Sequence, residues 1–136
     1  MFYNKLKKLL LVDVLIAERL KNLGFNYECY NFAIRKDEYN VYCYNKGHKS
    51  NWNDATIGYC SVPELDLVLK WFRDEKEIQI GFLPNWVKKR NKWLYAYFIT
   101  GDVIESGMSG ENYEYEEAQI KAIIKTLEFL EKKEKE

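Results

Sequence analysis

Stretches with a helical spacing of apolar residues alternate along this chain with pairs of strand-like stretches, and this order constrains the fold most. Helical spacing covers residues 13–23, 61–72 and 115–133, and strand-like stretches cover residues 26–34, 40–44, 77–82 and 92–100. Helices mixed with short antiparallel strands are typical of an α+β domain. The predicted order is therefore α-β-β-α-β-β-α, with helices packed on an antiparallel sheet.

Residues that cap helices indicate where the first two helices begin or end. Asp13 is a good N-cap, and Gly24 ends the first helix in the left-handed conformation that glycine favours. Ser61 and Glu64 have the spacing of a capping box, and Pro63 is tolerated in a first turn. The sequence therefore predicts that the second helix opens at Ser61.

Alternation along the predicted strands assigns their faces. In the first strand Tyr30, Phe32 and Ile34 share one face, while Cys29, Asn31 and Ala33 share the other. The strand over residues 92–100 is apolar on both faces, so we expect it to be central and covered on each side. Residues 85–91 are predicted as a basic loop, and the glycine-rich residues 101–112 as the most mobile loop.

Composition limits the domain organisation and the kinds of partner. The 136 residues suit one domain over 1–136, with a charged tail at 131–136 that we expect to fray. Twenty-one basic residues balance twenty-one acidic ones, which argues against binding extended nucleic acid. Three widely spaced cysteines suggest reduced thiols, and no stretch is apolar enough for a membrane span. We therefore expect a cytoplasmic protein.

Three stretches carry a family resemblance: VDVLIAERLKNLGFNYECYNF (12–32), CSVPELDLVLKWFRDEKEIQIGF (60–82) and YEYEEAQIKAIIKTLEFL (113–130). Their shared features are Ser61-x-Pro63 followed by Lys70-Trp71-Phe72-Arg73, and Tyr115-x-Glu117-Ala118 at the opening of the last helix. This pattern resembles a family of small uncharacterised bacteriophage and prophage accessory proteins. The resemblance implies a phage or mobile-element setting in a bacterial cytoplasm, and it carries over no functional residue.

The basic loop is the first candidate site, because it places cations between two indole rings. Lysine and arginine hold phosphate, and an indole stacks on a nucleobase, so the residue types suit a small anionic nucleotide. The alternative is a solvated loop with Trp93 in the core. The candidate ligand-binding residues are Trp86, Lys88, Lys89, Arg90 and Trp93, beside Lys92.

Tyrosines of the first predicted hairpin form the second candidate site. Tyr27, Tyr30, Tyr39, Tyr42 and Tyr44 all lie there, and tyrosine is frequent both in strands and in binding hot spots. The candidate interface residues are Tyr30, Tyr42, Tyr44 and Trp52.

Catalytic and metal chemistry find weak support. His48 is the only histidine, and it lies near Asp54 without a recognisable nucleophile. The acidic residues at the start of the last helix, Glu111, Glu114, Glu116 and Glu117, suit the helix dipole. We therefore predict no catalytic residues, no metal site and no cofactor.

These observations favour a non-enzymatic phage-type binding protein, with counter-defence by sequestering a small immune nucleotide signal as the preferred role. A homo-oligomer would complete a site of which one chain shows only half. The alternative is a protein–protein inhibitor of a host defence or host enzyme. A small metal-dependent hydrolase or nuclease that uses His48 and Asp54 is the most remote alternative.

Overall fold

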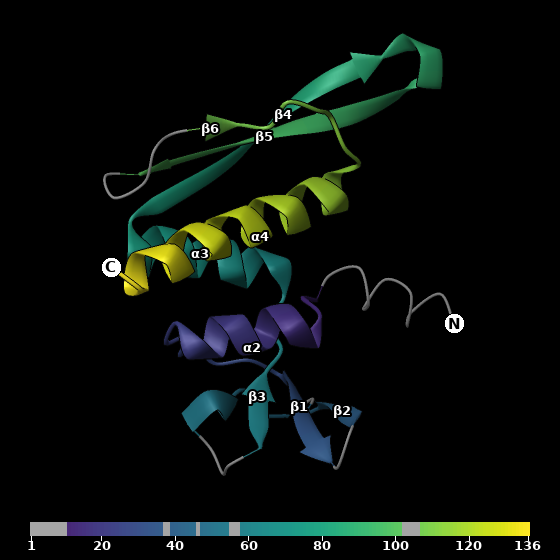
Figure 1. The fold of residues 1–136 in the computed structure, drawn as a ribbon. Coiled ribbons are helices and arrows are strands. Elements are labelled where there is room, and N and C mark those ends of the chain that lie inside the picture. Colours follow the sequence, from purple (N-terminus) through teal and green to yellow (C-terminus); the bar gives the residue numbers. More distant parts are fainter. Residues whose placement is uncertain (1–10, 37–38, 46, 55–57, 102–106) are drawn as a thin grey trace. The chain divides into compact units, whose positions relative to one another are not determined.

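The structure is a computed structural model that describes residues 11–36, 39–45, 47–54, 58–101 and 107–136. These residues confirm the α+β class and the order α-β-β-α-β-β-α, with two short strands added (Figure 1). The chain forms two compact units, residues 1–67 and 68–136, and one three-stranded antiparallel sheet lies in each. The expectation of one domain over the whole chain stays a prediction. The elements are α2 (Val14–Asn22), β1 (Asn31–Lys36), β2 (Tyr39–Tyr44), the 3-10 turn η1 (Trp52–Asp54), β3 (Tyr59–Ser61), α3 (Leu65–Lys76), β4 (Ile78–Val87), the 3-10 turn η2 (Lys88–Arg90), β5 (Lys92–Gly101), β6 (Gly107–Met108) and α4 (Tyr115–Glu134).

In the first unit, α2 has the predicted ends. The Asp13 carboxylate accepts a hydrogen bond from the N–H of Ile16 at 2.8 Å, and Gly24 has a φ of +93°. An aspartate N-cap satisfies one of the free N–H groups of the first turn, and glycine takes a left-handed φ without steric cost. Both ends of this helix are therefore local properties of the sequence.

The sheet of the first unit has the strand order β2-β1-β3, and α2 packs on β3 (Figure 1). Cys29, Asn31 and Ala33 are buried, whereas Phe32 and Ile34 on the other face are half-buried. The predicted alternation is thus confirmed from Asn31 to Ile34. It is wrong for Tyr30, which precedes β1 and has its ring near that of Tyr44, opposite Asn31. The Nζ of Lys21 donates to the backbone carbonyl of Tyr59 at 2.7 Å and ties α2 to β3.

The predicted capping box of the second helix is wrong. Ser61 lies in β3, opposite Phe32 of β1, and α3 begins only at Leu65. The Ser61 hydroxyl accepts a hydrogen bond from the backbone N–H of Trp52 at 3.0 Å. Pro63 restrains the residue before it to an extended conformation, so the chain stays extended past Ser61 and turns into helix later.

The second unit is organised by a long hairpin of β4 and β5. The two strands pair from Ile78 opposite Gly101 to Val87 opposite Lys92. The predicted end of the first strand at Phe82, and the loop predicted from Asn85, are therefore wrong. A Cβ at Gly81 would overlap the ring of its cross-strand partner Phe98, so a larger residue at that position would require this ring to move.

In the second sheet the order is β4-β5-β6, so β5 is central, as predicted. Ile99 of β5 is buried on the face that α4 covers (Figure 1), and Leu94 and Ala96 are buried on the other face. Trp93 and Thr100 of the same strand are exposed. Coverage of both faces is therefore confirmed for the middle of β5 and fails at its ends.

The segment before α4 follows β5 closely. Tyr113 and Tyr95 exchange backbone hydrogen bonds of 2.8 and 2.7 Å, and the Ser109 N–H donates to the Tyr97 carbonyl at 2.9 Å. The loop predicted over 101–112 is therefore wrong for Gly101 in β5 and for residues 107–108, which form β6, whereas residues 109–112 are irregular as predicted. Residues 102–106 of that prediction lie outside the described residues, and its mobility stays a prediction. The helix α4 continues to Glu134, so residues 131–134 are helical. The fraying expected for residues 131–136 stays a prediction.

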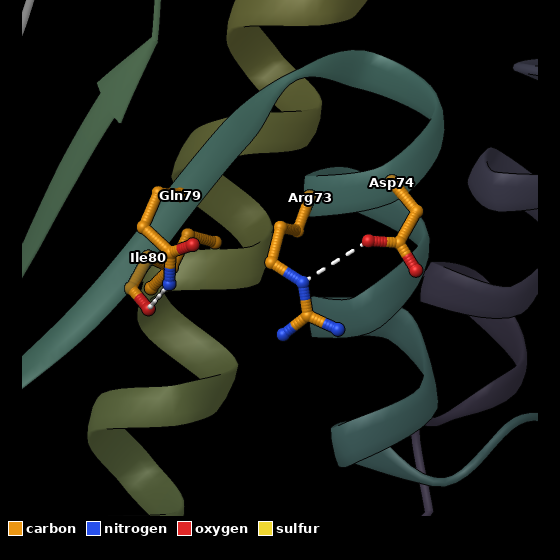
Figure 2. A network of polar contacts seen from close by, with 4 residues as sticks. All are labelled: Arg73, Asp74, Gln79 and Ile80. Carbon is orange, nitrogen blue, oxygen red and sulfur yellow. Dashed lines mark hydrogen bonds and ion pairs between the residues drawn. The ribbon is translucent and has the colours of Figure 1, made fainter.

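The junction of α3 and β4 contains local polar contacts (Figure 2). The Nε of Arg73 donates to the neighbouring Asp74 carboxylate at 3.1 Å, and the Gln79 amide donates to the carbonyl of Ile80 at 3.3 Å. Between them Glu77 takes a left-handed φ of 56°. The chain reverses from helix to strand at this residue.

Candidate functional site

The hairpin tip, defined as residues 86–93, contains all five predicted ligand-binding residues. Three of them, Lys88 to Arg90, form the turn η2. Asn91 follows with a φ of 51° and a ψ of 46°, and asparagine tolerates this left-handed conformation better than most side chains. The tip projects beyond the N-terminal end of α4 (Figure 1).

Trp86 and Trp93 are directly opposite each other across the hairpin. The N–H and carbonyl of Tyr95 point toward Tyr113 and away from β4. Because the direction of the backbone groups alternates along a strand, those of Trp93 also point away from β4. Trp93 and Trp86 therefore form a non-hydrogen-bonded pair, the type in which the side chains lie closer together. Their ring centroids are 5.5 Å apart with an interplanar angle of 70°. The two residues remain 51% and 52% exposed, so each indole packs against the other and still offers surface to a ligand.

The cations of the tip differ in their surroundings. Lys92 forms an ion pair with Glu114, and the hydrogen bond from Lys92 lowers the pKa of that carboxyl below its usual value. Lys88, Lys89 and Arg90 are exposed, and no ion pair to them is found in the part of the chain that the structure describes. Three cations of the turn are therefore available to an anion.

Further aromatic rings continue from the indole pair toward α4. Tyr95 packs edge-on against Tyr115 with centroids 4.9 Å apart, and Phe82 lies 5.4 Å from Tyr115. Tyr115 is itself 40% exposed. The Asn85 amide donates to the side-chain oxygen of Asn112 at 2.8 Å and fastens the hairpin to the segment before α4.

Sequence reasoning missed the contributions of Tyr115, Glu114 and Asn112 to this site. The alternation of Trp93, Tyr95 and Tyr97 was visible in the chain, and it indicated one aromatic face of β5. Nothing in the spacing shows that residues 107–113 run back along β5, because that pairing joins residues far apart in the sequence. Only the tertiary structure could add these residues.

The candidate interface residues divide between the two faces of the first sheet. Tyr42 and Tyr44 are opposite the buried Ala33 and Asn31, and they are 57% and 43% exposed. Trp52 stacks at 4.0 Å on Phe32, which belongs to the other face. Its indole N–H donates to the Cys29 carbonyl at 2.7 Å. Trp52 therefore has a packing role in the loop around η1.

Tyr30 lies near one of the two exposed tyrosines. Its ring centroid is 6.0 Å from that of Tyr44, and the Nζ of Lys49 is 4.9 Å from the Tyr30 ring. The structure thus brings Tyr30 and Tyr44 together, and Tyr42 lies on the same face of β2 as Tyr44. Trp52 instead stacks on the other face of the sheet.

The residues considered for catalysis lie on exposed parts of the first unit. His48 is exposed and contacts Trp52 edge-on at 6.4 Å, and Asp54 ends the turn η1. Burial raises the pKa of the Cys29 thiol to about 12 and that of the Cys60 thiol to about 11, which disfavours the reactive thiolates. Within the described residues no group of three His, Cys, Asp or Glu side chains is placed to hold a metal ion.

Comparisons with protein families, with curated proteins and with solved structures give no match to this chain. The resemblance to phage accessory proteins therefore stays a prediction. As for membranes, none of the helices in the described ranges has the length and apolar character needed to cross one.

Proposed function

We propose that the protein is a non-enzymatic binding protein whose hairpin tip holds a small anionic nucleotide. The observation that carries this proposal is the half-exposed pair of Trp86 and Trp93 directly beside three exposed cations of the turn. The proposed role is counter-defence in a bacterial cytoplasm, by sequestering a nucleotide signal. This role rests on the resemblance to phage accessory proteins.

The chemistry of the tip supports a ligand that has both a planar ring and phosphate. A nucleobase can stack on an exposed indole, and stacking of this kind contributes about 1 to 3 kcal/mol per base. Charge-assisted hydrogen bonds from Lys88, Lys89 and Arg90 would hold the phosphate. A hairpin turn covers only one side of such a ligand, whereas small-molecule sites are concave, so a second chain is expected to complete the site.

The experiment is a calorimetric and tryptophan-fluorescence titration with a panel of cyclic and linear nucleotides, and with inorganic phosphate as reference. The expected result is binding by at least one nucleotide, with quenching of indole emission. Trp86→Ala and the triple change of Lys88, Lys89 and Arg90 to Gln should each weaken binding at least about tenfold, from the stacking and charge contributions above. Silence across the whole panel would remove the nucleotide proposal.

A matched control comes from the end of α4. Lys132, Lys133 and Lys135 are exposed and near one another in sequence, so changing them to Gln removes the same charge from a distant place in the chain. This control should bind like the unchanged protein. Equal weakening by both triple variants would mean that the measured affinity reports overall charge and not the tip.

A gain-of-affinity variant tests the same site from the other direction. Glu114→Gln removes the carboxylate that pairs with Lys92, which leaves Lys92 free for a phosphate. We expect binding to tighten several-fold, because a hydrogen bond to a charged group contributes about 1.5 to 3 kcal/mol before the cost of ordering the side chain. Unchanged affinity in Glu114→Gln would exclude Lys92 from the site.

The alternative role as a protein–protein inhibitor of a host defence or host enzyme stays a prediction. Tyr42 and Tyr44 would form its interface. A metal-dependent hydrolase using His48 and Asp54 gains no support from the exposed positions of these two residues.

A further inference from the structure

The sheet edges differ in how they are protected against pairing with another chain. At β3 the Ser61 N–H donates to the Asn53 side chain at 2.9 Å, and the Tyr59 carbonyl accepts from Lys21 at 2.7 Å. The strand β6 has two residues. In β4, Pro84 lies opposite Tyr95, whose backbone groups bond to Tyr113 on the other side of β5. The nitrogen of Pro84 therefore points to the outer edge of the sheet, where it offers no N–H to another strand.

The edge of β2 has none of these protections. Its six residues, YNVYCY from Tyr39 to Tyr44, include no charge, no proline and no glycine. All six pair with β1 in a continuous register without a bulge. Among the described residues no strand pairs with the outer side of β2. Natural proteins rarely leave such an edge open, because its free N–H and carbonyl groups form a template for another strand.

Hydrogen bonds at the strand ends identify which backbone groups point outward. The Asn45 N–H donates to the Tyr30 carbonyl at 3.0 Å, so in steps of two Cys43 and Val41 also bond to β1. The hydrogen bonds on the opposite side of β1 support this assignment, because the Arg35 N–H and the Asn31 carbonyl bond toward β3. The backbone N–H and carbonyl of Tyr42 therefore point away from the sheet.

We propose that the outer edge of β2 pairs antiparallel with β2 of a second copy of this chain, with the two-fold axis at Tyr42. In a two-fold interface each residue on the axis meets its own copy, so a charge there would face a like charge. β2 is uncharged throughout, which permits self-pairing and provides no charge pattern for a different partner. The exposed Tyr42 rings then form a cross-strand aromatic pair. The dimer joins two three-stranded sheets into one of six strands.

The test measures mass in solution by light scattering after size-exclusion chromatography, together with amide hydrogen exchange at several protein concentrations. The unchanged chain should be a dimer, and the Tyr42 amide should become protected as concentration rises. Tyr42→Pro removes an outward N–H together with the exposed ring and breaks no hydrogen bond to β1, which an edge strand tolerates, so this variant should fold and be monomeric. Tyr42→Thr keeps the N–H and should still dimerise, more weakly.

A second disrupting variant keeps the test decisive if Tyr42→Pro does not fold. Tyr42→Lys places like charges on the two-fold axis while the side chain stays exposed, so it should be a folded monomer. A monomeric unchanged chain without protection at Tyr42 would overturn the proposal, and so would a dimer that survives both variants. Capture of a host protein through Tyr42 by a monomeric chain would favour the inhibitor role instead. Nucleotide binding at the hairpin tip is tested separately, because its residues lie in the other unit.

Discussion

Among the residues that the structure describes, two other than glycine have a left-handed backbone, and their side chains differ. Asn91 has a φ of 51° in the hairpin tip, and Glu77 has a φ of 56° between α3 and β4. Asparagine tolerates this conformation, whereas for most other L-residues it costs roughly 1 to 2 kcal/mol. Glu77 follows the last residue of α3, a position that glycine usually takes, and glutamate does not tolerate a left-handed φ as asparagine does. The backbone strain is therefore larger at Glu77 than at Asn91.

Glu77→Gly should therefore stabilise the protein by about 0.5 to 1 kcal/mol, after allowing for the greater freedom of glycine in the unfolded chain. The free energy of unfolding is measured by urea denaturation. Glu77→Ala is the control, because it removes the carboxylate and retains the steric cost, so it should give no gain. A destabilising Glu77→Gly would show that the carboxylate makes a contribution larger than the strain.

At the scale of the elements, local rules predicted both ends of α2 but placed the start of α3 too early. Asp13 caps α2 because both partners lie within one turn. Ser61 has the same capping chemistry, but its hydroxyl accepts from Trp52 and its N–H donates to Asn53. The strand pairing of Ser61 with Phe32 outweighs the local capping preference. A residue type with two uses is assigned by the tertiary contact that it makes.

Ser61→Asp separates these two roles. At a helix N-cap, aspartate replaces serine with little change, and Asp13→Ser in α2 should show this. At Ser61, which is 1% exposed, a larger and charged carboxylate would be buried, and we expect a loss of about 2 to 3 kcal/mol in the free energy of unfolding. If Ser61→Asp left the free energy of unfolding unchanged in the same denaturation experiment, the capping interpretation would be restored.

The length of β4 was the second prediction at this scale to fail. The alternation of Ile78, Ile80 and Phe82 predicted a strand that ends at Phe82. In the structure the nitrogen of Pro84 points to the open edge of the sheet, where no ladder hydrogen bond is lost. This extension brings Trp86 opposite Trp93 and thereby creates the pair at the candidate site.

For the whole molecule, the shifted pKa values predict how stability changes with pH. Burial raises the pKa of Cys29 from 9.0 to about 12 and that of Cys60 from 9.0 to about 11. The folded chain then keeps protons that the unfolded chain loses, so stability is full below about pH 9 and falls as pH rises toward 11. The pKa values of Tyr97 and Tyr113 are also raised, and this too lowers stability as the pH rises.

The expected loss is about 1 kcal/mol per pH unit for each buried thiol, measured as the free energy of unfolding in urea under reducing conditions. The double change of Cys29 and Cys60 to Ala should reduce this slope, whatever its effect on stability at neutral pH. A slope that is the same in the double variant would show that the thiols do not govern the alkaline transition.

The sequence by itself determined the α+β class, the order of helices and strands, the ends of α2 and the place of the cations beside two indoles. These properties depend on periodicity, capping and turn preferences, which act over a few residues. Tertiary structure alone decided that Trp86 lies opposite Trp93, that Glu114 neutralises Lys92, and that Ser61 belongs to a strand. Each of these depends on pairing between residues distant in the chain, where hydrogen bonds between strands outweigh local preference.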